Sequence, residues 1–219
     1  MQRILEPEVM DSWEEAIQYD AMNFTEVNVA FAQHAIALGP PSGLVLDAGT
    51  GTARIPILIC QACPTWQVIA IDLAQNMLRL GTRNLQQTGL SSQIVLELGD
   101  AKQLAYADGL FDMVISNSLV HHLPDPLPFL RELQRSLKPN GAILIRDLLR
   151  PPDQVTMDVL VARLGSDGSE SQKRLFRNSL QAAFTLDEVK QLVQAAGIEE
   201  TKIYQSSERH WTLERAWGQ

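Results

Sequence analysis

At 219 residues, of which 45% are apolar and 20% are charged, the chain is long enough for one well-buried domain and short for two, so we expect a single domain over residues 1–219. Its net charge of −8, with no run of more than two basic residues, disfavours nucleic acid and anionic lipid as partners. No segment has the apolar length of a membrane span, and the N-terminus lacks the charged and apolar regions of a secretory signal. We therefore expect a soluble, cytoplasmic protein, whose oligomeric state the sequence leaves undetermined.

The chain opens on a helical region at about residues 12–38, which we place in an N-terminal cap over residues 1–38. Short β-rich runs then recur at 44–48, 67–72, 94–98, 111–117 and 142–148, with helical patterns among them at about 53–62, 75–87 and 126–137. Alternation of this kind predicts right-handed crossovers and a parallel sheet. Residues 151–184 lie outside the pattern, and we interpret them as an insertion on the substrate side of the sheet.

The C-terminal part adds a helix and a hairpin. Thr185 and Glu188 predict a capping box that begins a helix, and Gly197 predicts its end. Two further strand-like runs, near 201–207 and 210–216, lie too close together for a crossover and should pair antiparallel. The predicted fold class is therefore α/β, a doubly wound Rossmann-like sheet of seven strands with helices on both faces, mostly parallel and ending in an antiparallel hairpin.

The two cysteines, Cys60 and Cys63, form the sequence CQAC at the end of a predicted helix, just before Pro64. A reactive pair usually begins a helix instead, because the helix dipole lowers the thiol pKa there. Two thiols are also too few for a tetrahedral zinc site. We interpret both as buried thiols on a helix face, and we expect no metal site in the chain.

The turn after the first strand is the part of the sequence that best indicates a function. It contains Asp47, Gly49, Thr50 and Gly51, and the next strand ends in Asp72. A buried strand, a glycine turn, a helix and a second strand that ends in a carboxylate describe a pocket for a nucleoside-bearing cofactor. The dinucleotide fingerprint would place its third glycine at position 54, where this chain has Arg54, and this weakens a nicotinamide-dependent interpretation.

The turn resembles motif I of the class I S-adenosylmethionine-dependent methyltransferases, an acid followed by GxGxG, in the small-molecule branch similar to methyltransferase types 11 and 25. Ala53 stands where the third glycine usually lies, which implies that position 53 need not adopt a positive φ. The resemblance covers most of residues 40–150. It continues through Asp72, through Gly99-Asp100-Ala101 after the third strand, through Ile115-Ser116-Asn117 at the end of the fourth, and through Leu137-Lys138-Pro139-Asn140-Gly141 before the fifth.

This resemblance implies S-adenosylmethionine as the cofactor and S-adenosylhomocysteine as its product. The cofactor presents an ammonium, a carboxylate, a sulfonium and a ribose diol, so its site needs acceptors, a loop of backbone donors and an exposed acid at a strand end. In the family, the position of Asp72 binds the ribose hydroxyls and that of Asp100 lies at the adenine. The cofactor-binding candidates are Asp47, Gly49, Thr50, Gly51, Asp72, Leu73, Asp100, Ala101, Asn117, His122 and Tyr19.

Three of these candidates have a structural alternative. Asp47 could cap the glycine turn and Asp72 the helix that begins near Ala74, because aspartate does both routinely. Tyr19, which we place ahead of the N-terminal helix, is a candidate lid over the cofactor and equally a packing residue.

Two histidines follow the fourth strand, in the sequence Asn117-Ser118-Leu119-Val120-His121-His122. The pattern resembles a stretch of small-molecule methyltransferases in which a histidine works with an aspartate at the end of the fifth strand to deprotonate a hydroxyl. Asp147 occupies that strand end here. The hypothesis is that His121 and Asp147 are catalytic, with His121 as the base and His122 nearer the cofactor. The alternative is that His121 only bonds to backbone.

The expected partner is a small-molecule methyl acceptor, whose reacting atom (O, N or C) the sequence does not decide. The proline-aromatic platform of nucleic-acid amino-methyltransferases is replaced here by SNSLVHHL, which disfavours RNA, DNA or protein as the acceptor. Another class stays open, a cofactor-binding protein of the same fold that transfers no methyl group. A nicotinamide-dependent oxidoreductase is the remaining alternative.

Overall fold

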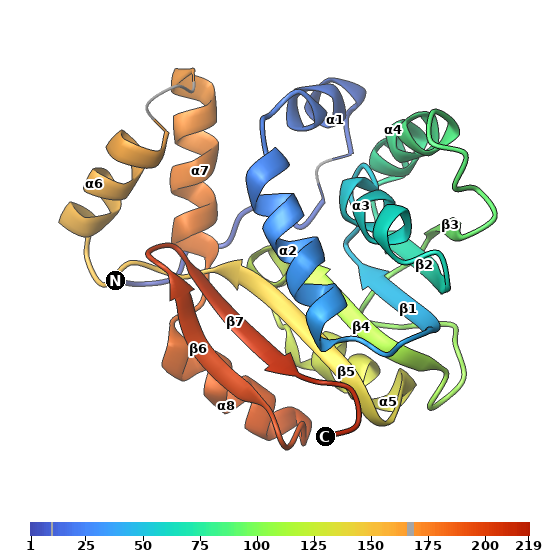
Figure 1. The fold of residues 1–219 in the computed structure, drawn as a ribbon. Helices are drawn as coiled ribbons and strands as arrows, with labels where there is room; N and C mark the ends of the chain where they lie inside the picture. Colours follow the sequence, from blue (N-terminus) through green and yellow to red (C-terminus); the bar gives the residue numbers. More distant parts are fainter. Residues whose placement is uncertain (10, 166–168) are drawn as a thin grey trace.

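A seven-stranded sheet forms the centre of the computed structural model, which describes residues 1–9, 11–165 and 169–219 (Figure 1). The strands lie in the order β3-β2-β1-β4-β5-β7-β6. The first five in this order are parallel, whereas β7 runs antiparallel to both β5 and β6. This confirms the predicted fold class. The strands are β1 (Gly43–Ala48), β2 (Trp66–Asp72), β3 (Ile94–Leu98), β4 (Phe111–Asn117), β5 (Leu137–Leu148), β6 (Lys202–Ser207) and β7 (His210–Arg215).

Helices cover both faces of the sheet, and each face has its own apolar core (Figure 1). On one face Phe31, Ile59 and Trp66 pack together, and on the other face Phe129 and Leu133 are buried. Buried apolar runs in the central strands leave both faces to be covered, as parallel sheets require. The helices are α2 (Thr25–Leu38), α3 (Arg54–Ala62) and α4 (Gln75–Gln86) on the first face, and α5 (Leu127–Ser136) and α8 (Leu186–Ala196) on the second.

The remaining helices lie beyond the carboxyl ends of the parallel strands, where open α/β sheets bind ligands (Figure 1). They are α1 (Trp13–Asp20), the 3-10 helix η1 (Val120–His122), α6 (Gln154–Leu164) and α7 (Glu170–Ala182). Helix α1 of the predicted cap and helices α6 and α7 of the predicted insertion thus lie at the same end of the sheet, whereas α2, which also belongs to residues 1–38, covers the first face (Figure 1). Residues 166–168 of the insertion fall outside the described ranges.

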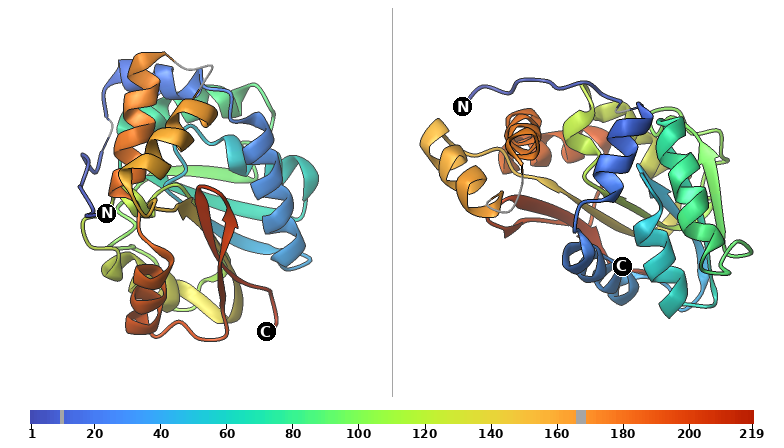
Figure 2. Two further views of the ribbon diagram at one scale, coloured as in Figure 1. Left: turned by 90° about the vertical axis from the view of Figure 1, so that its left-hand side faces the viewer. Right: turned by 90° about the horizontal axis from the view of Figure 1, so that it is seen from above.

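The N-terminal segment, residues 1–9, runs in extended form from α6 and α7 toward α1 (Figure 2). The Met1 ammonium donates to the Pro152 carbonyl at 2.7 Å, and the Ile4 amide donates to the Gln181 carbonyl at 3.1 Å. This segment is called the strap below. Within the described ranges, every helix is too short or too polar to cross a membrane.

Three local features differ from the expectations drawn from the sequence. Ala53 does adopt a positive φ, of 63°, a left-handed conformation that costs alanine about 1 kcal/mol. Tyr19 lies in the last turn of α1 rather than ahead of the helix. Strand β5 begins at Leu137, five residues before the predicted start at 142, because Leu137 already pairs with Phe111.

The end of α2 provides a test of the packing on the first face. A methyl group added at Gly39 would lie 2.3 Å from Cη2 of Trp66, whose indole is 1% exposed and donates to the Pro40 carbonyl at 3.0 Å. We expect Gly39→Ala to lower the free energy of unfolding by about 1–3 kcal/mol, the usual cost of overpacking. Urea unfolding followed by tryptophan fluorescence measures this. Gly99→Ala is the matched control, since its methyl group would lie 3.6 Å from Ile71; equal losses in the two variants would contradict the packing.

Candidate active site

The glycine turn between β1 and α3 is tied to the end of β2 by its backbone amides. The amide of Gly49 and the one after it both donate to the Ile71 carbonyl at 2.9 Å, and the Gly51 amide donates to Asp72 Oδ2 at 2.7 Å. Gly49 has a φ of 76°, and a Cβ added there would lie 3.0 Å from the Cβ of Leu119. Glycine is therefore needed at position 49 both for its backbone conformation and for the space that Leu119 occupies.

Asp72 has two structural partners and also lines a cleft. While Oδ2 binds the Gly51 amide, Oδ1 accepts the amide of Ala74 at 2.9 Å, at the start of α4. Burial raises the pKa of this carboxyl group. A carboxylate has about four lone-pair positions, so two hydrogen bonds leave room for a ligand. Holding the turn before α4 and binding a ligand are thus compatible roles for Asp72, while the N-cap residue of α4, Ala74, supplies no side-chain cap.

Asp47 lies deeper, with 2% of its surface exposed, and burial raises its pKa to about 7. Its Oδ2 atom and Oγ1 of Thr50 are both buried, and apart from the contact between these two side chains neither has a hydrogen-bond partner among the described residues. Buried polar atoms without partners are rare and costly. Their presence beside the glycine turn indicates that a ligand group completes the turn.

The cleft lies at the carboxyl end of the sheet and brings together most of the predicted cofactor residues. Eight of them line it, namely Tyr19, Gly49, Asp72, Leu73, Asp100, Ala101, Asn117 and His122. The other three, Asp47, Thr50 and Gly51, belong to the same turn but are not lining residues. Two residues of the strap, Glu8 and Val9, also line the cleft, and no motif in the sequence predicted them as site residues.

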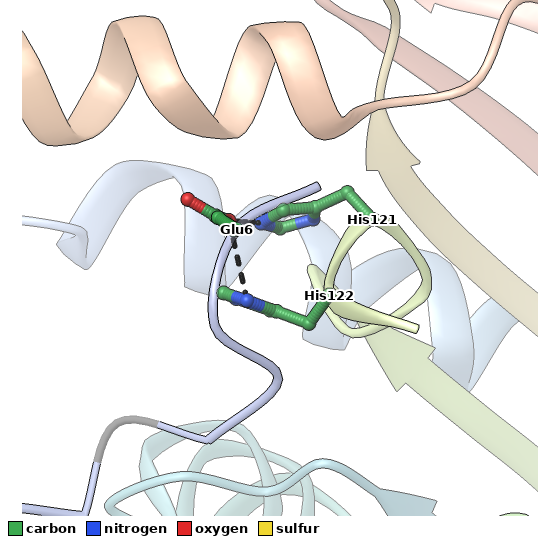
Figure 3. A group of neighbouring side chains, drawn as sticks. All are labelled: Glu6, His121 and His122. Carbon is green, nitrogen blue, oxygen red and sulfur yellow. Dashed lines mark ion pairs between the residues drawn. The ribbon is translucent and has the colours of Figure 1, made fainter. Parts of the chain in front are cut away.

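The two histidines of η1 face a carboxylate that comes from the strap (Figure 3). Oε1 of Glu6 lies 3.4 Å from Nε2 of His121 and 3.2 Å from Nδ1 of His122. On the other side of the ring, Nδ1 of His121 lies 2.6 Å from Oδ1 of Asp147. His121 is 4% exposed and Asp147 1%, so the predicted pair is present and almost fully buried. Of the two histidines, only His122 lines the cleft.

Charge and burial act differently on the members of this cluster. Burial works to lower the pKa of His121, but the carboxylates of Asp147 and Glu6 outweigh it and raise that pKa. The pKa of Asp147 is lowered in return, since His121 outweighs the effect of burial. Burial, with His121 adding to it, lowers the pKa of His122 to about 4. His122 is therefore neutral near pH 7 and has a free lone pair on its ring.

Cys60 and Cys63 lie at the end of α3, and both are free thiols. Cys60 is buried and Cys63 half-buried, and burial raises both thiol pKa values, that of Cys60 to about 12. A thiol held in its protonated form is a poor nucleophile. The predicted role of a buried thiol on a helix face is thus confirmed for Cys60, whereas Cys63 lies just beyond α3 and is only half-buried.

Comparisons with known proteins agree on one family. Residues 46–145 match a family described as a methyltransferase domain. The chain is 30% identical over 161 residues to the demethylmenaquinone methyltransferase of Bacillus cytotoxicus, a match that covers 69% of this chain and 66% of that protein. The chain belongs to the class I S-adenosylmethionine-dependent methyltransferases. This membership sets aside the nicotinamide-dependent alternative.

Solved structures of this methyltransferase class share the fold. One from Aquifex aeolicus has a TM-score of 0.70 and 17% identity, over 95% of this chain and all (100%) of that one. The phosphoethanolamine N-methyltransferase 2 of Haemonchus contortus, solved with phosphomonomethylethanolamine and S-adenosylhomocysteine, has a TM-score of 0.68 and 20% identity, over 88% of this chain and 43% of that one. The matched regions cover 46% and 66% of two curated relatives, so the chain spans about half to two thirds of their length.

S-adenosylmethionine is the cofactor of this family, and the methyltransferase site fits it. The carboxylate of Asp72 lines the cleft with lone pairs to spare for the ribose diol. Asp47 Oδ2 and Thr50 Oγ1, which lack partners other than each other's side chain in the described part of the chain, fit the polar amino-acid end of such a molecule. Tyr19 packs on Phe24 with ring centroids 5.5 Å apart and supplies an aromatic wall to the cleft.

The raised pKa of Asp47 predicts a pH dependence of stability. The folded state holds its proton up to a pH of about 7, whereas the unfolded chain releases it near 3.8. The folded state thus binds more protons between these values, so this group's contribution to stability is lost as the pH rises through that window, at about 1.4 kcal/mol per unit at most. We expect Asp47→Asn to remove this loss. Urea unfolding of the parent protein and of the Asp47→Asn variant, from pH 4.5 to 8 without cofactor, measures this. If the free energy of unfolding depends on pH in the same way in both proteins, the raised pKa of Asp47 is contradicted.

Proposed function

We propose that the protein transfers the methyl group of S-adenosylmethionine to a small-molecule acceptor that carries a hydroxyl group on a ring. The observation that carries the proposal is the buried Asp147–His121 pair beside a cleft that fits the cofactor. The matched relatives are named demethylmenaquinone methyltransferases, which supports an acceptor of the quinol type. The acidic net charge of −8 supports a small molecule over nucleic acid.

The cofactor would be held along the carboxyl ends of β1, β2 and β3. Asp72 and Leu73 would bind its ribose, and Asp100 with Ala101 its adenine. The turn of Asp47, Gly49, Thr50 and Gly51 would bind the amino-acid end through backbone donors and the buried side-chain oxygens. Asn117, His122 and Tyr19 would close the wall near the reacting methyl group.

When bound, S-adenosylmethionine supplies a methyl carbon on a sulfonium, which departs as the neutral thioether of S-adenosylhomocysteine once the acceptor's electron pair forms the new bond. The protein has to orient the acceptor, exclude water and remove a proton from the hydroxyl. Asp147 holds the proton of His121 on Nδ1, which leaves the lone pair of Nε2 free to accept the proton of the acceptor's hydroxyl group. The imidazolium so formed would lie between the carboxylates of Asp147 and Glu6.

Cofactor binding tests the first half of the proposal. We expect calorimetric titration to show micromolar binding of S-adenosylmethionine and S-adenosylhomocysteine, and Asp72→Ala to weaken it about 10- to 100-fold, since a charge-assisted hydrogen bond is worth about 1.5–3 kcal/mol. Asp11→Ala is the matched control. Its carboxylate accepts the Asn76 amide at 3.0 Å at the start of α4 but does not line the cleft. Absent heat from a folded sample would refute the cofactor site.

Transfer tests the second half. With radiolabelled cofactor and a panel of reduced short-chain demethylmenaquinone analogues, phenols and phosphoethanolamine, we expect transfer to a ring-hydroxyl compound. His121→Ala and Asp147→Asn should each lower kcat about 10²- to 10⁴-fold, the usual contribution of a general base, and leave cofactor affinity nearly unchanged. His34→Ala on α2, which removes a histidine paired with Glu214 at 2.9 Å, is the control. Cofactor binding without transfer to any compound would favour the catalytically silent alternative.

A further inference from the structure

Glu6, His121 and His122 lie together as a set of metal-ligating side chains, although the sequence places Glu6 far from the histidines (Figure 3). One ligand atom from each, Oε1 of Glu6, Nε2 of His121 and Nδ1 of His122, lies within 4.8 Å of the other two. We propose that these three side chains bind a divalent transition-metal ion of the zinc type. The proposal rests on the acceptor site of the proposed function, and in the metal-loaded protein the ion replaces Nε2 of His121 as the group that promotes loss of the hydroxyl proton.

The spacing of the ligand atoms fits such an ion. Bonds of 2.0–2.1 Å from zinc to nitrogen and oxygen give a tetrahedron with edges of about 3.3–3.4 Å. Glu6 Oε1 lies 3.4 Å from His121 Nε2 and 3.2 Å from His122 Nδ1. Two of the three edges thus already have the length that a bound ion requires.

Two of the three ligand atoms also lack any other partner. Oε1 of Glu6 and Nδ1 of His122 are buried and make no hydrogen bond to the rest of the described chain. Buried polar atoms normally find partners, and a cation shared between an oxygen and a nitrogen would satisfy both. Two imidazoles and one carboxylate favour zinc, iron or nickel over magnesium and calcium, which prefer oxygen ligands alone.

Two of the three ligands, His121 and Glu6, are held by a hydrogen bond on the side away from the ion, as is common in metal sites. Asp147 accepts from Nδ1 of His121 at 2.6 Å and is itself held by the Val120 amide at 2.5 Å, so the lone pair of Nε2 points away from the sheet. Oε2 of Glu6 accepts from the Ser179 hydroxyl at 3.3 Å, which leaves Oε1 for the ion. A carboxylate behind a histidine ligand fixes its tautomer and raises its basicity.

Arg3 secures the strap that carries Glu6. Its guanidinium lies 3.8 Å from the centroid of the Phe184 ring and donates to four backbone carbonyls at 2.6–3.1 Å. The carbonyls are those of His121, Leu123, Pro124 and Ala182. Because Arg3 binds the carbonyl of His121 itself, the segment that supplies the carboxylate is attached to the turn that supplies the imidazoles.

An ion at this position would supply Lewis-acid chemistry to the acceptor. Three protein ligands leave a coordination position open, and His122 places the ion at the wall of the cofactor cleft. A hydroxyl oxygen bound there would release its proton to water more readily, because a divalent ion lowers the pKa of its bound oxygen. In the loaded protein His121 Nε2 is then a ligand, and proton removal no longer depends on its basicity.

The experiment measures metal binding directly, on the full chain with any affinity tag removed. After metal stripping with a chelator and dialysis, we expect one equivalent of Zn²⁺ per chain, by calorimetry and by elemental analysis after gel filtration. Co²⁺ should give the visible absorption bands of a tetrahedral site, and Mg²⁺ should give no heat. Glu6→Gln and His122→Asn should each weaken Zn²⁺ binding at least 100-fold.

Glu8→Gln is the matched control, because Glu8 lies on the same strap and pairs with Lys102 rather than with the histidines. It should keep the full zinc affinity. Substoichiometric zinc in the parent protein, or equal zinc affinity in the Glu6→Gln variant, would overturn the proposal. Titration of the parent protein and of the Glu6→Gln variant with S-adenosylmethionine separates this failure from that of the proposed function, since Glu6 does not line the cofactor cleft.

Discussion

The carboxylate of Asp147 is the group on which the acceptor side of the structure depends. With 1% of its surface exposed, it has to find donors for both oxygens or lose several kcal/mol of stability. The Val120 amide, the Leu148 amide and the His121 ring provide them at 2.5–2.6 Å. Since Val120 and His121 belong to η1, a single buried charge at the end of β5 attaches this turn to the sheet.

The strap then depends on η1. Arg3 donates to the carbonyls of His121 in η1 and of Leu123 directly after it, and Glu6 faces the two imidazoles. Further along, Glu8 and Val9 line the cofactor cleft, and Glu8 pairs with Lys102 after β3. One extended segment therefore contacts both the histidines of η1 and the cleft at the glycine turn. Movement of the strap would alter both together.

Much of the fold follows from sequence patterns because each strand and helix has a local signal. The central strands are apolar runs that need cover on both faces, and the capping box of Thr185 and Glu188 with Gly197 is read from adjacent residues. The Asp147–His121 pair was also predictable, because parallel strands bring their carboxyl ends to one edge of the sheet.

Other features have no local signal. Glu6 reaches the histidines only through the path of the strap, and that path depends on the contacts of Arg3 with backbone carbonyls, which any sequence presents. The positive φ of Ala53 is imposed by the turn, and Gly81 on α4 leaves the space for it, since a Cβ there would lie 3.3 Å from the Cβ of Ala53. Such constraints come from neighbours that are distant in the chain.

The contact between Gly49 and Leu119 joins the two halves of the site in another way. Gly49 belongs to the cofactor turn and Leu119 to the segment that leads into η1, and a Cβ at position 49 would lie 3.0 Å from that leucine. Shortening Leu119 alone would make space at position 49 but would leave the positive φ, which a residue with a side chain adopts only at a cost of about 1 kcal/mol. Under the proposed function, a change of shape around residue 119 that suits another acceptor would have to keep clear of Gly49, so this contact would couple acceptor specificity to cofactor binding.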